Sequence, residues 1–171
     1  LRRNRNDLSV EQIDQLERQK GHDVAGAIAE FGEVAQIGGE ILHNGMTSED
    51  VLSNAENKQI NDSFDILRPK LVGTLEAFAS QIEKNKDLTC VGWTHLQAAE
   101  PTTMGYRFAK YAQDLLQDLK ILDALRPMIK TKGIKGAVGT SASFDEIFEG
   151  TNMTAEKQEN EVMRKFDIDA A

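Results

Sequence analysis

The sequence predicts an all-α protein built mainly from long helices. Apolar residues recur every three or four positions over two long segments, which is the period of a helix and not of a strand. Three prolines, two tyrosines and one tryptophan are too few for the turns and aromatic core of an all-β sandwich. The 171 residues, 40% hydrophobic and 28% charged, are typical of a soluble globular chain, either one domain or a piece of a larger one.

Two short helices are expected first. Ser9 offers a hydroxyl cap for a helix that begins at Val10, and Gly21 ends this helix. His22 and Asp23 then begin a second helix, which a pair of glycines ends. The apolar stripe of the second helix consists of Val24, Ala27, Ile28, Phe31 and Val34.

A much longer helix is expected over about residues 48–86. Thr47 and Ser48 offer hydroxyl caps, and two acidic residues follow in the first turn, where they complement the helix dipole. At ~1.5 Å per residue this helix would be roughly 58 Å long, which indicates a long bundle or an oligomer interface. Pro69 predicts a kink or a local break near Arg68. The apolar stripe consists of Ile60, Phe64, Leu67, Leu71, Leu75, Phe78 and Ile82.

A second long helix follows an irregular segment. Residues 88–101 are rich in strand-prone side chains, so we expect them to be irregular or briefly extended. Thr102 or Thr103 caps the helix, and Pro127 bends or interrupts it. Its apolar stripe consists of Met104, Phe108, Tyr111, Leu115, Leu119, Leu122 and Leu125.

A glycine-rich segment, residues 132–141, precedes two short helical pieces at about residues 144–148 and after Thr154. Backbone amides and two lysines of this segment could wrap a phosphate. The segment is not a Walker loop, because no Gly-Lys-Ser/Thr tripeptide closes it. The alternative is a flexible, solvated connection.

Charge and composition exclude several classes of protein. The formal charge of −8 argues against a general nucleic-acid binder, although a small anion needs only a local cluster of donors. The longest uncharged stretch, residues 88–99, is far shorter than the ~20 residues of a membrane helix. The single cysteine, Cys90, excludes an intramolecular disulfide and a cysteine-based zinc site, and it suits a reducing compartment. No pair of histidines has the spacing of a helical metal site, so we expect no metal.

The three histidines, His22, His43 and His95, all lie beside helix starts or breaks. His95 has the most suggestive context, because the Thr94 hydroxyl and the Gln97 amide flank it on a non-helical segment. An imidazole can give or take a proton near neutral pH. The alternative is a structural histidine that ties this segment to a helix.

Thr47 and Ser48 could also form an anion site. Their hydroxyls and the unpaired N–H groups of a helix start suit a carboxylate or a phosphate. Plain N-capping is the alternative. Glu49 and Asp50 in the same turn weaken the contribution of the helix dipole.

Four sequence blocks are informative when taken together: residues 22–24 (His-Asp-Val), 45–51, 92–105, and 133–140 with Ser143 and Phe144. In this order they resemble the adenylosuccinate lyase family of the fumarase/aspartase superfamily, over nearly the whole chain. The Thr94-His95 block followed by Pro-Thr-Thr is the most specific. Argininosuccinate lyase, fumarase and aspartase share the Thr-His element but generally lack the His-Asp-Val block.

The resemblance implies the long-helix bundle of that superfamily and the elimination of fumarate. The substrates would be adenylosuccinate, which gives AMP, and succinyl-aminoimidazole-carboxamide ribotide. A proton leaves the carbon next to a carboxylate and a nitrogen departs, so the reaction needs an acid and donors for the carboxylate. By the family pattern His95 would be the general acid, and no cofactor is required. The substrate-binding residues would be His22, Asp23, Thr47, Ser48 and Thr94.

Two features depart from the family pattern. Gly21 replaces the arginine or asparagine of many relatives, although Lys20 could supply that contact. The mobile signature loop, whose serine is believed to be the base, and the arginine-bearing N-terminal segment are absent from these residues. We therefore expect an internal fragment that is inactive alone. Residues 1–46 would end the N-terminal helical domain, and residues 47–171 would begin the central long-helix domain, with the C-terminal part absent.

The resemblance also implies partners and a location. The partners would be a purine nucleotide substrate and copies of the same chain, because full-length members build each site from three subunits of a homotetramer. We expect no nucleic acid and no membrane, and a cytoplasmic protein. Two alternatives remain: another lyase of the superfamily, or a helical oligomerisation module whose Thr, Ser and His residues only cap helices.

Overall fold

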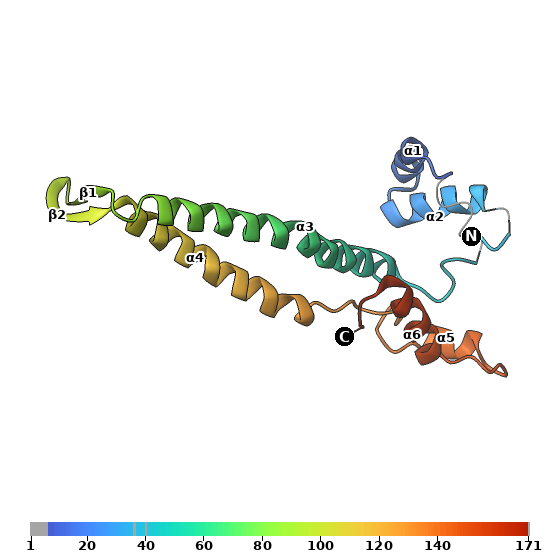
Figure 1. Cartoon of the computed structure of the whole chain (residues 1–171). Helices are drawn as coiled ribbons and strands as arrows, with labels where there is room; N and C mark the ends of the chain where they lie inside the picture. Colours follow the sequence, from blue (N-terminus) through green and yellow to red (C-terminus); the bar gives the residue numbers. More distant parts are fainter. Residues whose placement is uncertain (1–6, 36, 40, 171) are drawn as a thin grey trace. The chain divides into compact units, whose positions relative to one another are not determined.

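The computed structural model describes residues 7–35, 37–39 and 41–170, and it divides into two compact units. The first unit comprises Leu1–Lys58 and Lys130–Ala171, and the second comprises Gln59–Ile129. The prediction of an all-α fold is confirmed, since helices dominate and the named strands form one short hairpin (Figure 1). In chain order the elements are α1 (Val10–Lys20), α2 (Asp23–Val34), α3 (Ser48–Lys84), β1 (Thr89–Thr94), β2 (Gln97–Thr103), α4 (Met104–Leu125), the 3-10 turn η1 (Arg126–Met128), α5 (Ala142–Ile147) and α6 (Ala155–Phe166).

In the first unit, α1 and α2 form a closely packed pair. The Ser9 Oγ accepts a hydrogen bond from the Gln12 N–H at 3.2 Å, and Gly21 ends α1 in the left-handed conformation, with φ of 68°, as predicted. Gly26 of α2 lies against the backbone of α1, because a Cβ at this position would be 2.7 Å from the backbone nitrogen of Glu17. Only glycine permits this approach of the two helices.

The C-terminal part of the first unit has a small apolar core. The Phe144 ring of α5 is 1% exposed and stacks on the ring of Phe148, with centroids 6.4 Å apart. Thr154 caps α6, as predicted, by accepting a hydrogen bond from the Lys157 N–H at 3.2 Å. The buried residues of this core are Ile134, Phe144, Ala155 and Met163.

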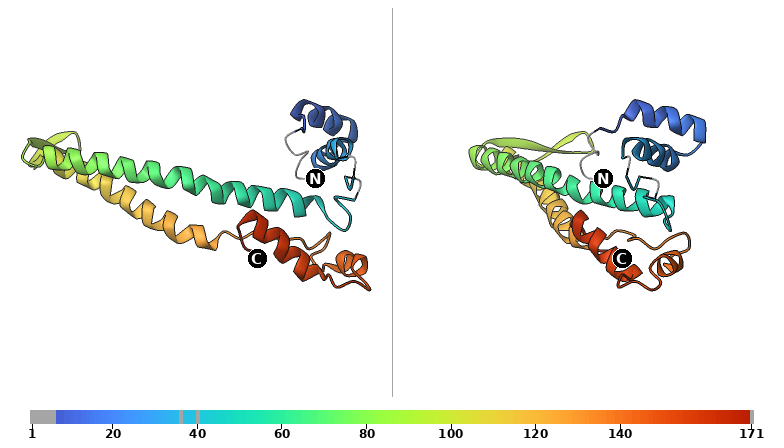
Figure 2. Two further views of the ribbon diagram at one scale, coloured as in Figure 1. Left: turned by 45° about the vertical axis from the view of Figure 1, so that its right-hand side comes forward. Right: turned by 90° about the vertical axis from the view of Figure 1, so that its right-hand side faces the viewer.

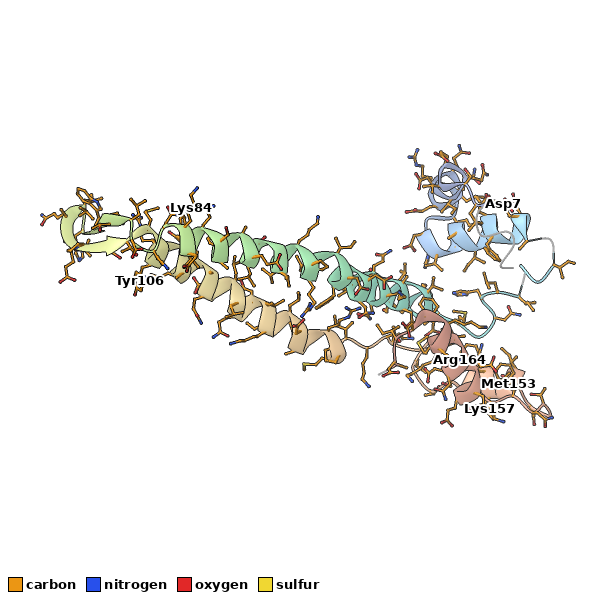
Figure 3. The ribbon with its side chains drawn as sticks, viewed as in Figure 1. Asp7, Lys84, Tyr106, Met153, Lys157 and Arg164 are labelled. Carbon is orange, nitrogen blue, oxygen red and sulfur yellow. The ribbon has the colours of Figure 1, made fainter. Side chains whose placement is uncertain are left out.

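In the second unit, α4 runs back alongside α3 (Figures 1 and 2). The Phe78 and Phe108 rings meet edge to face, with centroids 6.3 Å apart. Towards the other end of the pair, Arg68 Nε donates to Asp123 Oδ1 at 2.7 Å. Lys84 and Tyr106 mark the end of the pair that adjoins the hairpin (Figure 3). The two helices are antiparallel, and the predicted apolar stripes meet at Phe78 and Phe108, whereas other members of the stripes are exposed: Ile60, Leu67, Tyr111 and Leu125.

Of the kink or local break predicted near Arg68, the break is wrong, because α3 continues through Pro69 from Ser48 to Lys84, while the kink stays a prediction. Proline inside a helix removes one backbone donor, and its ring crowds the carbonyl four residues earlier. The neighbouring Arg68 pairs with Asp123, and Arg126 Nη1 donates to Asp65 Oδ1 at 2.6 Å. The residues on the N-terminal side of Pro69 are thus joined to the end of α4 and to η1.

Residues 88–101, predicted to be irregular or briefly extended, form most of an antiparallel hairpin. Thr94 pairs with Gln97, so the turn consists of two residues. The β2 strand leads directly into α4, where the Thr103 Oγ1 accepts a hydrogen bond from the Tyr106 N–H at 3.1 Å. Of the two threonines predicted as the cap, Thr103 is the one that acts.

Candidate active site

Three of the predicted site residues meet in the first unit, where α2 and α3 begin. His22 Nε2 lies 3.2 Å from Ser48 Oγ, and His22 Nδ1 lies 3.0 Å from Asp23 Oδ1. The side chains of His22 and Asp23 are about half exposed, so an incoming ligand can reach them. The structure therefore brings together residues of the first and second sequence blocks, 26 positions apart.

Local backbone geometry explains this arrangement. His22 precedes α2 with an extended backbone and no capping bond from its side chain, so its ring is available to partners outside the helix. Asp23 Oδ1 accepts from the Val24 N–H at 2.7 Å, which holds its carboxylate beside His22 Nδ1. In the tautomer that carries its proton on Nδ1, the N–H donates a hydrogen bond to Asp23. Nε2 then accepts a hydrogen bond from the Ser48 hydroxyl.

A surface cavity of about 370 Å³ opens at this point. A cation from Lys20, two imidazoles and a hydroxyl line it, together with apolar side chains of α2. This set of donors has the chemistry that an anion requires, in a protein whose formal charge is −8. The lining residues are Lys20, His22, Val24, Ala25, Ile28, Ala29, His43 and Ser48.

His43 was among the candidate histidines but was not selected from the sequence. It lines this cavity and also a neighbouring apolar cavity of about 270 Å³. Its Nε2 atom is buried and has no hydrogen-bond partner within the part of the chain that the structure describes. His43 lies two residues before Gly45, the first residue of the second sequence block, and this proximity is the signal that could have identified it.

Thr47 lies beside this cavity rather than among its lining residues. Its backbone N–H donates to Asp50 Oδ2 at 3.1 Å. This amide of the helix start is therefore used by a carboxylate of the same turn. The other predicted anion donors are the hydroxyls of Thr47 and Ser48 and the remaining N–H groups of this helix start.

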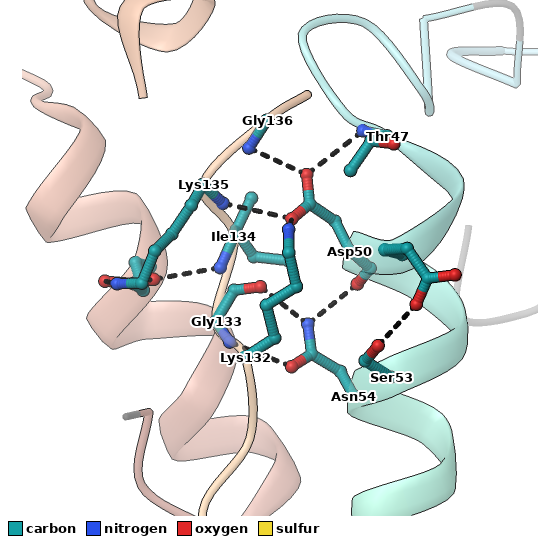
Figure 4. A network of polar contacts seen from close by, with 11 residues as sticks. Thr47, Asp50, Ser53, Asn54, Lys132, Gly133, Ile134, Lys135 and Gly136 are labelled. Atoms are coloured by element: carbon teal, nitrogen blue, oxygen red, sulfur yellow. Dashed lines mark hydrogen bonds and ion pairs between the residues drawn. The ribbon is translucent and has the colours of Figure 1, made fainter. Parts of the chain in front are cut away.

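Two interpretations of the glycine-rich segment, a phosphate-wrapping loop and a flexible, solvated connection, are wrong for residues 132–136. The donors of these residues are taken by other side chains of the protein. The segment is held by acidic and amide side chains of α3 and α6 (Figure 4). Lys132 Nζ pairs with Asp50, and Lys135 Nζ pairs with Glu159 at 2.9 Å. Asn54 donates to the Gly133 carbonyl at 2.8 Å and accepts from the Gly133 N–H at 2.9 Å.

His95 and Thr94 belong to the second unit. His95 and Leu96 form the two-residue turn of the hairpin, with φ values of 50° and 62°. The left-handed conformation is costly for such side chains, which lack the short polar groups of asparagine or the freedom of glycine. Strain of this kind gathers at functional positions. His95 is exposed at this turn, and its convergence with His22 and Ser48 stays a prediction.

Across residues 7–35, 37–39 and 41–170, no group of three or more His, Cys, Asp or Glu side chains is arranged to hold a metal ion. None of the helices in these residues combines the length and apolar character that crossing a membrane requires.

Comparisons with known proteins identify the family. A family model described as "Lyase" matches residues 2–159. The adenylosuccinate lyase of Saccharomyces cerevisiae is 38% identical over 86% of this chain and 31% of that protein. The adenylosuccinate lyase of Methanothermobacter thermautotrophicus is 34% identical over 81% of this chain and 31% of that protein. The chain thus spans about a third of the length of these curated relatives.

Solved structures show the same fold. A fumarate lyase from Mesorhizobium sp. has a TM-score of 0.81 at 24% identity, over 95% of this chain and 37% of that chain. The 3-carboxy-cis,cis-muconate lactonizing enzyme from Pseudomonas putida has a TM-score of 0.83 at 22% identity, over 95% of this chain and 36% of that chain. Because the family model matches most of the sequence and the fold agrees, the chain belongs to the lyase family.

Proposed function

We propose that this chain forms part of an adenylosuccinate lyase, a carbon–nitrogen lyase of purine and AMP biosynthesis. The reaction would release fumarate from adenylosuccinate, and from the related succinyl-aminoimidazole-carboxamide ribotide. The observation that carries the proposal is the His22 ring held between Asp23 and Ser48 at the edge of a cation-bearing cavity. The names of the curated relatives point to the same substrate.

The chemistry of the cavity suits such a substrate. A succinyl group brings two carboxylates and the nucleotide brings a phosphate, so several anionic groups need donors. Lys20 supplies a cation, and His43 and Ser48 add polar groups on the same wall. Charge-assisted hydrogen bonds of this kind are the strong ones, and they orient as well as bind. Lys20 thereby takes the place of the basic or amide side chain that Gly21 lacks.

His22 and Asp23 would orient the substrate, and Thr47 and Ser48 would hold a carboxylate. Asp23 favours the His22 tautomer with a proton on Nδ1, and Nε2 then shares the Ser48 hydroxyl. As the proton next to the carboxylate leaves, negative charge grows on that carboxylate. Donors that are already in place stabilise the transition state, in which this charge develops, more strongly than they stabilise the ground state. This difference lowers the barrier.

His95 would be the general acid that protonates the departing nitrogen, with Thr94 beside it. The hairpin turn projects an exposed imidazole from the junction of β1 and β2, and an imidazole can lose a proton near neutral pH. We propose that it meets the anion cavity of a different copy of the chain, in a homotetramer. In this assembly residues 1–46 end the N-terminal domain and residues 47–171 begin the central domain. The location we propose is cytoplasmic, which suits the free thiol of Cys90.

Two rivals need to be separated from this proposal. One is another lyase of the superfamily, since the fold neighbours carry different substrate names. The full-length protein that carries this sequence should be assayed in parallel with adenylosuccinate, argininosuccinate and malate. Fumarate release from adenylosuccinate supports the proposal, whereas turnover of only one of the others contradicts it.

The other rival is a helical oligomerisation module, which the exposed side chains of Tyr106 and Tyr111 on α4 favour. The test is His95→Asn, because asparagine tolerates the left-handed turn and removes the imidazole. A tetramer of normal stability that has lost turnover supports the catalytic role. Unfolding with no specific loss of rate supports the oligomerisation module. Leu96→Asn is the matched control, since it changes the other turn residue and keeps His95.

A further inference from the structure

The Asp50 carboxylate in the first unit joins the start of α3 to the glycine-rich segment (Figure 4). Its side chain is fully buried. Oδ2 accepts from the Thr47 N–H at 3.1 Å and from the Gly136 N–H at 2.9 Å, while Oδ1 accepts from the Lys135 N–H at 3.1 Å. Lys132 Nζ also donates to Oδ1. One carboxylate therefore binds four donors: the nearby Thr47 amide, and three groups of residues 132–136 that lie more than 80 positions further along the chain.

These contacts lead to the candidate site. Thr47, whose amide Asp50 holds, is the neighbour of Ser48, whose hydroxyl meets His22 Nε2. Asp50 does not line the cavity itself. We infer that Asp50 is a positioning residue, which acts through the Thr47 amide to hold the Ser48 hydroxyl at His22. Its effect on turnover rests on the proposed function, whereas its effect on the His22–Ser48 contact does not.

The arrangement requires a carboxylate at this position. Four donors converge on two oxygens, and an asparagine would offer one oxygen and turn an NH₂ group towards donors. Substitution of Asp50 by asparagine would also leave the Lys132 ammonium group without its charged partner, and the Lys132 side chain is only 30% exposed. Burial raises the pKa of the Asp50 carboxyl, but the hydrogen bonds from Lys132 and the backbone amides outweigh burial and lower this pKa overall.

A neighbouring residue separates positioning from simple anchoring. Asn54, one turn further along α3 and 1% exposed, holds the same segment through both backbone groups of Gly133. Its side chain also donates to the Asp50 backbone carbonyl at 2.7 Å, but its hydrogen bonds do not include Thr47. Asn54→Ala thus loosens the glycine-rich segment and keeps the carboxylate that holds Thr47, which makes it the matched control.

The experiment uses the full-length protein that carries this sequence, with labelled histidine, at a temperature where each variant is folded by circular dichroism. Asp50→Asn should lower kcat by up to about 100-fold, the loss that a displacement of 1 Å can cause in a catalytic site. It should also move the His22 ring NMR signals towards those of a Ser48→Ala protein. Asn54→Ala should leave kcat and these signals close to wild type. Equal effects of Asp50→Asn and Asn54→Ala on both readouts overturn the inference.

Two further variants keep the test decisive if Asp50→Asn does not fold. Asp50→Asn combined with Lys132→Met removes both charges, so it avoids an unpaired buried lysine and should show the same loss of kcat. Asp50→Glu keeps the charge and displaces it by one methylene, so it should shift the His22 signals; unchanged signals and kcat contradict the inference. If the wild-type protein does not turn over adenylosuccinate, the proposed function fails, and the His22 signals alone decide the inference.

Discussion

His22 Nε2 lies 3.2 Å from Ser48 Oγ, and this contact joins the residue that precedes α2 to the first residue of α3. Asp23 holds the opposite side of the same ring at 3.0 Å. His22 and Ser48 line the cavity that Lys20 and His43 also line, and Asp23 contacts His22 without being one of the lining residues. Two sequence blocks that are separate in the chain thus form one polar surface.

Substitution of Ser48 by alanine should weaken catalysis without unfolding the protein. The variant removes a hydroxyl that is proposed to hold a carboxylate, and a hydrogen bond to a charged group contributes about 1.5–3 kcal/mol. We expect kcat/KM of the full-length protein to fall by about tenfold or more. Ser53→Ala is the control, because Ser53 Oγ donates to Glu49 on the same helix and does not line the cavity. Equal kcat/KM values for the two variants would argue against the role of Ser48.

The Asp50 carboxylate should make the stability of the first unit sensitive to acid. Its pKa is lowered from the ordinary value of 3.8 in the folded protein, because the hydrogen bonds from its donors outweigh burial. Because the pKa of Asp50 is lower in the folded protein than in the unfolded protein, the charged carboxylate stabilises the fold. This stabilisation is fully present at a pH above the unfolded-state pKa, and it is lost as the pH falls through the folded-state pKa. From about pH 6 to about pH 3 the free energy of unfolding should therefore fall more in wild type than in Asp50→Asn.

The control for this pH dependence is Asp123→Asn in the second unit. Arg68 lowers the pKa of the Asp123 carboxyl through a hydrogen bond, but both side chains are nearly half exposed. Solvent screens such a pair, so its removal should change the acid sensitivity much less. Urea unfolding monitored by circular dichroism measures both cases. Parallel curves for wild type and Asp50→Asn would show that Asp50 is not the acid-sensitive group.

Local signals in the sequence predicted much of the fold. Ser9, Gly21, Thr103 and Thr154 act as helix boundaries where the pattern of caps and glycine placed them. These interactions involve residues only three or four positions apart, so the sequence contains all the necessary information. The predicted break near Arg68 is wrong, and the residues that pair with Arg68 and Asp65 beside Pro69 are Asp123 and Arg126, more than 50 positions away.

Long-range pairing explains what the sequence could not predict. The glycine-rich segment looked like a phosphate loop, because nothing near it in the chain indicates that Asp50, Asn54 and Glu159 take its donors. Similarly, the turn at His95 and Leu96 lacks the Asn-Gly signal of a two-residue hairpin, so only the pairing of the two strands reveals it. The contact between His22 and Ser48 could be expected only from the family resemblance.

The 171-residue chain alone should have negligible lyase activity. It carries the proposed acid, His95, but its sequence does not contain the signature loop whose serine would be the base. Acid and base act together in this elimination, so loss of one removes most of the acceleration. An ultraviolet assay of fumarate release from adenylosuccinate measures this, with the full-length protein as the positive control. Turnover by the purified chain alone would contradict the assignment of the base.

The chain should also associate with copies of itself. Large apolar side chains remain exposed on the hairpin and α4, including Trp93, Leu96 and Ile121, with Leu96 96% exposed. Exposed apolar surface of this kind indicates an interaction face. Light scattering should give a mass that is a multiple of 19.0 kDa, and Ile121→Lys should reduce it by placing a charge in the contact. A strictly monomeric wild-type chain is the result that speaks against the tetramer.

Two glycine substitutions in the second unit should have effects of opposite sign. A Cβ at Gly105, at the start of α4, would lie 2.7 Å from the Ile82 carbonyl oxygen and from the Lys86 Cα, so Gly105→Ala must push α4 away from the end of α3. We expect a loss of about 1–3 kcal/mol in the free energy of unfolding, the usual cost of overpacking.

Gly73 lies within α3, and among the described residues no atom would lie within 4 Å of a Cβ at this position. Gly73→Ala should therefore stabilise the helix by about 0.5–1 kcal/mol. Urea unfolding of the two variants gives the comparison, and a neutral Gly105→Ala would show that the packing of α4 against α3 is looser than these distances require.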